Sequence, residues 1–259
     1  MIPLTVRSYY SLMWGTASPA EICTAARKLG YTRLALTDTD NLYGLWPFVT
    51  ACRRAGITPI IGAEITDPGA DTRAVCLVKN DIGYRNLCRL ITRRHCEKPF
   101  RLAGALSDQS SGLIILTVCE ELLAALHAAG ATVAAAMPRR PSGRGLRLVK
   151  LARQIGIPAV ATPGSFFTRP EDFHLHRMLR AIDRNTSLSR LPAKEVAPPD
   201  AWLAAPGKYA RRFDVWPEAI QADAVRVRDI RTGVVGKTPL FGGVVRQGLR
   251  LRRRRTECT

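Results

Sequence analysis

Short apolar runs alternate along the chain with longer stretches whose apolar residues recur at helical spacing. The longer stretches predict helices over residues 18–29, 45–55, 81–96, 119–129 and 143–155. The apolar runs predict seven strands, at Pro3–Arg7, Arg33–Thr37, Thr58–Gly62, Arg73–Lys79, Gly112–Thr117, Thr132–Met137 and Pro158–Thr162. Strands that are apolar throughout and separated by helices favour parallel pairing with both sheet faces covered. Seven of them favour an α/β barrel, whose functional groups gather at the carboxyl ends of the strands.

The same pattern divides the chain into three parts. Residues 1–187 carry the strand and helix alternation and are expected to form the barrel. Residues 188–225 begin with a stretch rich in proline and alanine, which indicates a connection that leaves the barrel. Residues 226–259 lose the periodicity and are expected to form a basic, disordered tail.

Composition places the chain among globular proteins. Of its 259 residues, 46% are hydrophobic and 23% are charged, and no apolar run reaches the ~18–20 residues that a membrane span needs. The N-terminus lacks the basic start and apolar core of a secretory signal. Seven cysteines are scattered singly, which is typical of reduced thiols and not of a disulfide framework. We therefore expect a cytoplasmic protein without a membrane partner.

The net charge of +18 is unevenly distributed. Residues 226–259 contain ten Arg or Lys and two acidic residues, including the uninterrupted run Arg252, Arg253, Arg254 and Arg255. Such a run neutralises phosphates, so it predicts weak, non-specific and salt-sensitive contacts with DNA. The alternative is a solvated chain end with no partner, because no aromatic residues stand among the arginines to stack on bases.

Six motifs follow or contain the predicted strands and carry a family resemblance. They are TVRSYYSLMWG (5–15), ALTDTDNLYG (35–44), PIIGAEI (59–65), GYRNLCRL (83–90), GLIILTVC (112–119) and AVATPGSFFTRPEDFHLHRMLRAI (159–182). In order and spacing they resemble the PHP (polymerase and histidinol phosphatase) domain at the N-terminus of the bacterial DNA polymerase III alpha subunit, nearest to the error-prone type. The resemblance runs from about Pro3 to Ala219, and it implies a distorted seven-stranded, TIM-like barrel.

The resemblance also implies a centre for two or three divalent metals, Zn or Mn, held by histidines and carboxylates. In active members the first strand ends in His-x-His and is followed by an aspartate, and here these three positions are Thr5, Arg7 and Trp14. In the family's Asp-His-Gly-Asn, Asp38 keeps the aspartate and Thr39 replaces the histidine. In its late Asn-Asp-x-His, Gly164 replaces the aspartate and Phe166 replaces the histidine. The remaining ligand candidates are Glu64 and Cys119, with His95 as a further one.

These replacements predict an inactive centre without a metal cofactor. Threonine is a poor ligand for zinc or manganese, and phenylalanine cannot be one. At an effective dielectric constant near 20, a fixed charge ~4 Å from a monovalent cation costs roughly 4 kcal/mol, so Arg7 would oppose any metal placed beside it. We expect Glu64 to pair with Arg7 instead. The alternative is residual Zn or Mn binding by Glu64 and Cys119.

The polar and aromatic residues around these positions have structural interpretations. Asp38, Asp40 and Asn41 are expected to hydrogen-bond the loop after the second strand. His176 matches a histidine of the family's corresponding helix, and packing is its expected role. Six aromatic residues near the first two strand ends are expected to fill the space that the metals would occupy: Tyr9, Tyr10, Trp14, Tyr43, Trp46 and Phe48. The alternative is that they stack on bases.

Taken together, these observations predict a catalytically degenerate PHP domain that acts as a structural and interaction module in an error-prone polymerase system. Its implied partners are DNA polymerase subunits and DNA. One alternative is an active metal-dependent phosphoesterase or 3′–5′ exonuclease. Another is a nonfunctional gene fragment, for which the basic tail without periodicity is the main support.

Overall fold

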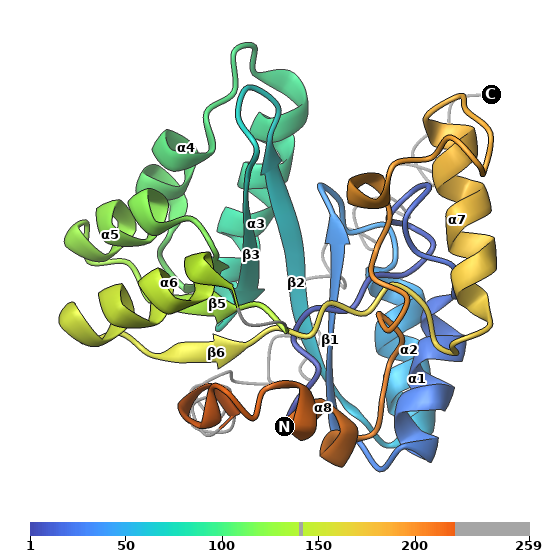
Figure 1. The fold of residues 1–259 in the computed structure, drawn as a ribbon. Coiled ribbons are helices and arrows are strands. Elements are labelled where there is room, and N and C mark those ends of the chain that lie inside the picture. Colours follow the sequence, from blue (N-terminus) through green and yellow to red (C-terminus); the bar gives the residue numbers. More distant parts are fainter. Residues whose placement is uncertain (140–141, 221–259) are drawn as a thin grey trace, which may run out of the picture.

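A computed structural model describes residues 1–139 and 142–220 of the chain. Its core is one curled six-stranded sheet with helices on the outside (Figure 1). The strands are β1 (Arg33–Thr39), β2 (Thr58–Asp67), β3 (Thr72–Val78), β4 (Leu113–Thr117), β5 (Val133–Met137) and β6 (Ala159–Ala161). The helices are α1 (Pro19–Lys28), α2 (Leu45–Ala55), α3 (Asp81–Cys96), α4 (Leu102–Gln109), α5 (Glu120–Ala128), α6 (Gly143–Gln154), α7 (Asp172–Asp183) and α8 (Pro206–Arg212).

The prediction of an α/β, TIM-like fold is confirmed, but the prediction that all strands run parallel is wrong. The strand order is β1-β2-β3-β4-β5-β6, and β3 is antiparallel to both of its neighbours. Only residues 68–71 separate β2 from β3. A parallel connection needs about a dozen residues, whereas an antiparallel hairpin closes with a few, so this short link forces the reversal.

The first of the seven predicted strands is not a strand of the sheet. Residues 3–7 instead run irregularly between β1 and the segment that follows β6, and they form one isolated parallel bridge, from Val6 to Ser165. Backbone hydrogen bonds reach β1 on one side, from Ala35 to Pro3 and from Thr37 to Val6, and Ser165 on the other. This segment therefore links the two open edges of the sheet and completes the barrel without regular strand geometry.

The strand sequences bury both faces of the sheet. Alternate residues point inward into a compact apolar cluster made of Leu4, Ala35, Ile60, Val75, Leu77, Ile114, Leu116, Ala134, Ala136 and Val160. The intervening residues, such as Leu34 and Leu36 of β1, pack outward against the helices. Successive side chains of a strand point to opposite faces of the sheet, so strands that are apolar at every position must have both faces covered. The barrel interior is therefore a packed core.

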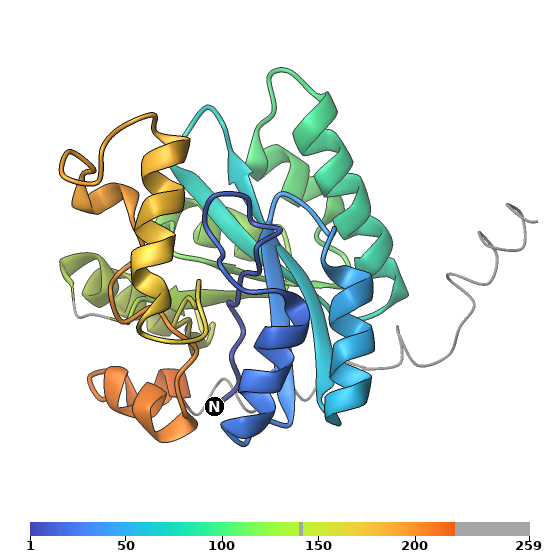
Figure 2. The same ribbon diagram turned by 90° about the vertical axis from the view of Figure 1, so that its right-hand side faces the viewer.

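The outer helices follow their sequence signals closely. Ser18 and Glu21 form a reciprocal capping box at the start of α1, and Pro19 occupies its first turn. Gly56 ends α2 with φ of +63°, a conformation that side chains other than glycine rarely adopt. Helices α1 and α2 run side by side along the outside of the sheet (Figure 2). The pattern missed α4, α7 and α8.

The segment predicted as a connection packs back onto the barrel as far as it is described. Ala201 and Leu203 are buried, and the Leu203 amide donates to the carbonyl oxygen of Phe167. The Tyr31 hydroxyl donates to the Ala204 carbonyl at 2.6 Å, which ties the segment to the start of β1. Arg252–Arg255 and the rest of the predicted tail lie outside the described residues. Within the described ranges, no helix has the length and apolar character needed to cross a membrane.

Candidate functional site

A cavity of about 130 Å³ opens at the carboxyl ends of the parallel strands, which we call the mouth of the barrel. The polar residues that line it are Thr5, Arg7, Glu64, Arg73, Thr117, Thr162 and Gly164. Four of the predicted positions therefore meet in one place, although they come from three distant segments of the sequence. This is where a barrel of this kind carries its functional groups.

Arg7 and Glu64 face each other across the mouth and form an ion pair. Both are buried, at 7% and 4% exposure, and the guanidinium of Arg7 lies over the ring of Phe166 at 4.4 Å from its centroid. The other carboxylate oxygen of Glu64 accepts from the Thr39 hydroxyl at 3.3 Å. The predicted Arg7–Glu64 pair is confirmed, and both oxygens of Glu64 have partners.

Asp38 is buried beside the mouth but turns toward the N-terminal segment. It accepts hydrogen bonds from the Ser8 amide at 2.7 Å, the Ser8 hydroxyl at 2.8 Å and the Ser11 hydroxyl at 2.7 Å. Burial raises the pKa of Asp38 above its ordinary value, although these three hydrogen bonds act in the opposite direction. Asp38 therefore holds residues 8–11 in place, and the prediction that it braces the loop after β1 is wrong.

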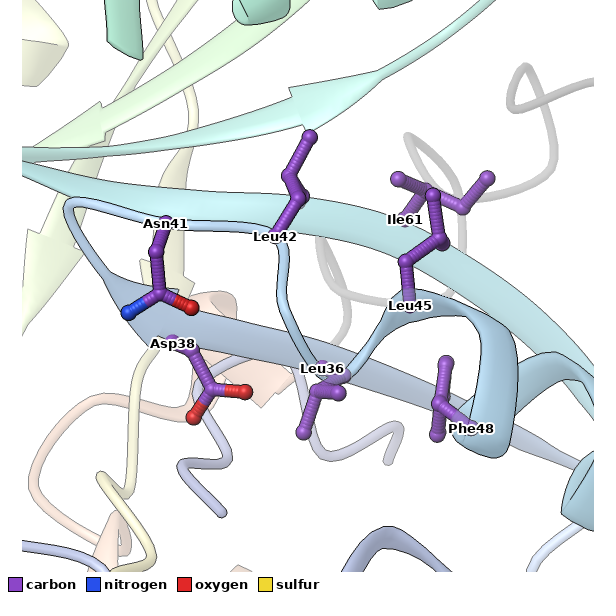
Figure 3. Close-up of a pocket in the computed structure, with 8 residues that line it drawn as sticks. Leu36, Asp38, Asn41, Leu42, Leu45, Phe48 and Ile61 are labelled. Atoms are coloured by element: carbon purple, nitrogen blue, oxygen red, sulfur yellow. The ribbon is translucent and has the colours of Figure 1, made fainter. Parts of the chain in front are cut away.

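Beside Asp38 lies a second, much smaller pocket of about 10 Å³, which has room for one water molecule at most. Figure 3 shows Asp38 and Asn41 at one end of it and the apolar side chains of Leu45, Phe48 and Ile61 at the other. The Asn41 amide donates to the carbonyl oxygens of Tyr10 and Thr39, so it braces the loop as predicted. This pocket is a packing defect with no room for a substrate.

Aromatic side chains fill the space on the other side of Arg7. Trp14 contacts Phe166 and His176 at centroid distances of 5.6 and 5.8 Å, and the guanidinium of the fully buried Arg180 stacks on Trp14 at 3.7 Å. His176 bonds the Trp14 carbonyl through Nδ1 and accepts from the Ala197 amide through Nε2. Burial lowers the pKa of His176. Its packing role and that of Trp14 agree with the prediction. For Tyr9, Tyr43 and Trp46 the prediction of packing is wrong, because these side chains are exposed.

Thr5 and Gly164 meet through the backbone. The Gly164 amide donates to the Thr5 hydroxyl at 2.9 Å, and Gly164 has φ of +59°, which glycine adopts without strain. The Arg139 side chain, which is 9% exposed, donates to the carbonyl oxygens of Pro163 and Gly164 and pairs with Asp200 at 2.9 Å. A guanidinium thus fixes the loop on which the resemblance places metal ligands.

The two remaining ligand candidates lie apart from the mouth cavity. The Cys119 thiol donates to Glu121 of its own helix at 3.1 Å, and burial raises its pKa, which opposes the thiolate form that binds metal. His95 bonds the Asp40 carbonyl at 2.7 Å on the exposed side of α3. Neither side chain joins Glu64, and in residues 1–139 and 142–220 no three His, Cys, Asp or Glu side chains are grouped to hold a metal.

Three arginines that shape the site escaped the sequence analysis: Arg73, Arg139 and Arg180. Arg73 lies 4.0 Å from Glu64, at the mouth, because β3 runs antiparallel and begins where β2 ends. The short link between β2 and β3 could have predicted this, because it requires an antiparallel turn that places the start of β3 beside the end of β2. Arg139 and Arg180 carry no local signal, because each acts on residues distant in the sequence.

The donor set does not fit a divalent metal centre. One carboxylate, Glu64, faces two guanidinium groups, and the nearest neutral donors are threonine hydroxyls. Zinc and manganese need several nitrogen, sulfur or carboxylate ligands without a competing cation. What this arrangement does chemically is to hold the N-terminal segment, β2 and the loop after β6 together.

Comparison with known proteins gives consistent matches. A family profile described as the PHP domain matches residues 3–135, just over half of the chain. A DNA polymerase III subunit alpha from Bacillus subtilis (strain 168) is 30% identical and is matched over 92% of this chain and 24% of its own length. An error-prone DNA polymerase from Anaeromyxobacter dehalogenans (strain 2CP-1) is 27% identical, over 95% and 24%. The chain therefore spans about a quarter of the length of these relatives.

Among solved structures, a Bifidobacterium adolescentis protein provisionally described as a metal-dependent phosphoesterase matches with a TM-score of 0.47 and 13% identity. The match covers 63% of this chain and 86% of that one. The likeness is too distant to bear on the chemistry of the site.

Proposed function

Because the chain belongs to the PHP domain family, we propose that it is a catalytically degenerate PHP module with a structural and interaction role in an error-prone polymerase system. The observation that supports this most directly is the buried Arg7–Glu64 pair, which occupies the mouth with opposite charges. Removing either partner would leave a buried charge unpaired, so the pair favours a fixed, structural centre.

The alternative is a metal-dependent phosphoesterase or 3′–5′ exonuclease. Such an enzyme uses bound metals to generate hydroxide and to stabilise the phosphoryl oxygens. The described residues offer Glu64 alone as a buried carboxylate in the cavity, and it is already paired. We therefore assign no catalytic residues and no metal cofactor.

The proposed partners are DNA polymerase subunits and DNA, bound weakly and without sequence preference, in the cytoplasm. The relatives named as polymerases support this proposal, as does the net charge of +18. We further propose that the barrel occupies residues 1–187, the packed exit segment 188–225, and a basic tail with Arg252–Arg255 the remainder.

Metal stoichiometry tests the degenerate centre. Protein dialysed against zinc or manganese and then against metal-free buffer should retain well under one ion per chain by elemental analysis. The quadruple variant Thr5→His, Arg7→His, Thr39→His, Phe166→His restores ligand types at the positions of the resemblance and should retain more. Two or more tightly held ions per wild-type chain, with hydrolysis of a phosphodiester substrate, would overturn the proposal.

A second experiment addresses the interaction role. The chain should co-elute in size-exclusion chromatography with an error-prone-type polymerase alpha chain whose own PHP region has been deleted. Co-elution should survive chelator, since no metal is involved in the proposed fold. Separate elution at micromolar concentrations would remove the interaction part of the proposal and leave the metal result intact.

A further inference from the structure

The end of the barrel opposite the mouth carries a cluster of cations that we call the basal patch. Its members are Arg27 and Lys28 in the last turn of α1, Arg33 at the start of β1, Arg53 and Arg54 in the last turn of α2, and Lys208 and Arg211 in α8. All are exposed except Arg33, which is half-buried.

Packing of three elements brings these residues to one surface. Helices α1 and α2 lie against each other, with the sulfur atoms of Cys23 and Cys52 at 3.4 Å shortly before their last turns. The ring of Tyr31, between α1 and β1, contacts the ring of Tyr209 in α8 at a centroid distance of 6.5 Å. Figure 1 places α8 at the same end of the molecule as the start of β1.

Acidic residues are missing from the segments that form the patch. Residues 22–37, 42–63 and 201–213 contain no Asp or Glu. Among the described residues, no carboxylate pairs with Arg27, Lys28, Arg54, Lys208 or Arg211. Several arginines elsewhere on the described surface are matched, as Arg93 is by Glu97, Arg94 by Asp40 and Arg147 by Glu120.

Helix dipoles account for part of this pattern. A cation in the last turn stabilises a helix by about 0.3–1 kcal/mol, which explains basic residues at the ends of α1, α2 and α8 one helix at a time. The dipole does not explain why three such ends converge on one surface that also holds Arg33 and Lys208. Nor does it explain why no carboxylate among the described residues pairs with Arg27, Lys28, Arg54, Lys208 or Arg211.

We propose that the basal patch is the surface through which this protein binds the phosphate backbone of double-stranded DNA. The proposal rests on the proposed role in a polymerase system and adds the location and kind of contact. Five of the seven cations are arginines, which match phosphate geometry better than lysine does. Contacts from these cations to phosphates carry no base-sequence information, so we expect binding without sequence preference.

The composition of the patch favours duplex DNA over other polyanionic partners. Segments 22–37, 51–63 and 201–213, which carry the cations, expose no large apolar side chain, whereas membrane-surface binding needs apolar residues that insert. The exposed Tyr43 and Trp46 lie at the start of α2, and Arg53 and Arg54 lie in its last turn. The cation-bearing segments also present no exposed aromatic residues on which unpaired bases could stack, as single-strand binders do. Cations spread over four elements suit the two backbones of a duplex.

Salt-dependent binding to a duplex of about 20 base pairs tests the proposal in the full chain. The basal variant is Arg27→Gln, Lys28→Gln, Arg54→Gln, and its matched control is Arg85→Gln, Arg89→Gln, Lys150→Gln, which removes the same charge from exposed positions on α3 and α6. Fluorescence anisotropy between 50 and 300 mM NaCl gives the slope of log K against log salt. Each lost phosphate contact should flatten the slope by about 0.9, so the basal variant should lose roughly 2–3 units.

The control variant should keep the wild-type slope to within about one unit. Equal losses in both variants would mean that net charge alone attracts DNA, and unchanged slopes in both would place binding elsewhere, for example on Arg252–Arg255; either result overturns the proposal. Loss of binding to anionic vesicles with DNA binding intact would assign the patch to a membrane and also overturn it. Circular dichroism confirms folding of each variant. The metal stoichiometry above is independent of this outcome.

Discussion

The mouth and the base of the barrel treat positive charge in opposite ways. At the mouth Arg7 is buried and bound to Glu64, and Arg73 stands beside the same carboxylate. At the base Arg27, Lys28 and Arg54 are exposed, with no paired carboxylate among the described residues. A buried cation needs a partner because its desolvation costs several kcal/mol, whereas solvent screens an exposed one. The charges at the mouth are therefore paired within the protein, while the exposed cations at the base can bind an anionic ligand.

The largest loss of stability should come from breaking the Arg7–Glu64 ion pair at the mouth. Arg7→Met leaves Glu64 buried without its cation and should destabilise the fold by about 3–5 kcal/mol in urea unfolding. The double variant Arg7→Met, Glu64→Leu removes both charges and should recover most of that loss. A double-mutant cycle that returns no coupling between these positions would contradict the structural role of the pair.

A smaller loss of stability is expected when the aromatic cluster of Trp14, Phe166 and His176 is disrupted. Trp14→Ala removes contacts with Phe166 and His176 and the ring on which Arg180 stacks, and it should cost about 2–3 kcal/mol of unfolding free energy. Trp46, which is half exposed, provides the control, and Trp46→Ala should cost less than about 1 kcal/mol. Equal losses from the two variants would show that the cluster adds nothing specific.

The smallest effect is a pH dependence at His176. Because burial holds its folded-state pKa below the ordinary value of 6.5, the unfolded chain takes up a proton first as the pH falls. Stability should be constant above that ordinary value and decline as the pH drops from 6.5 toward the lowered folded-state pKa. Urea midpoints between pH 5 and 7.5 should show this slope in the wild type and lose it in His176→Gln. The other three histidines are exposed, so a slope that persists in the variant would refute the assignment.

Local signals in the sequence determined most of the elements. The apolar runs locate β1 to β6, and the capping residues and glycines locate α1 and α2 closely. The motifs identified the PHP family, which the family match confirms. The sequence also indicated that Arg7 and Glu64 would pair, because the family resemblance places both residues at one former metal centre.

Tertiary structure decided what depends on distant residues. The direction of β3, and with it the place of Arg73 at the mouth, follows from a four-residue link whose geometry matters only once β2 is positioned. Residues 3–7 have the composition of a strand, yet they close the barrel irregularly because Ser165 and β1 offer them hydrogen bonds on two sides. The basal patch arises because α1, α2 and α8, far apart in the chain, end on one surface. Charge is a property of the sequence, but whether a charge is matched depends on what the fold places beside it.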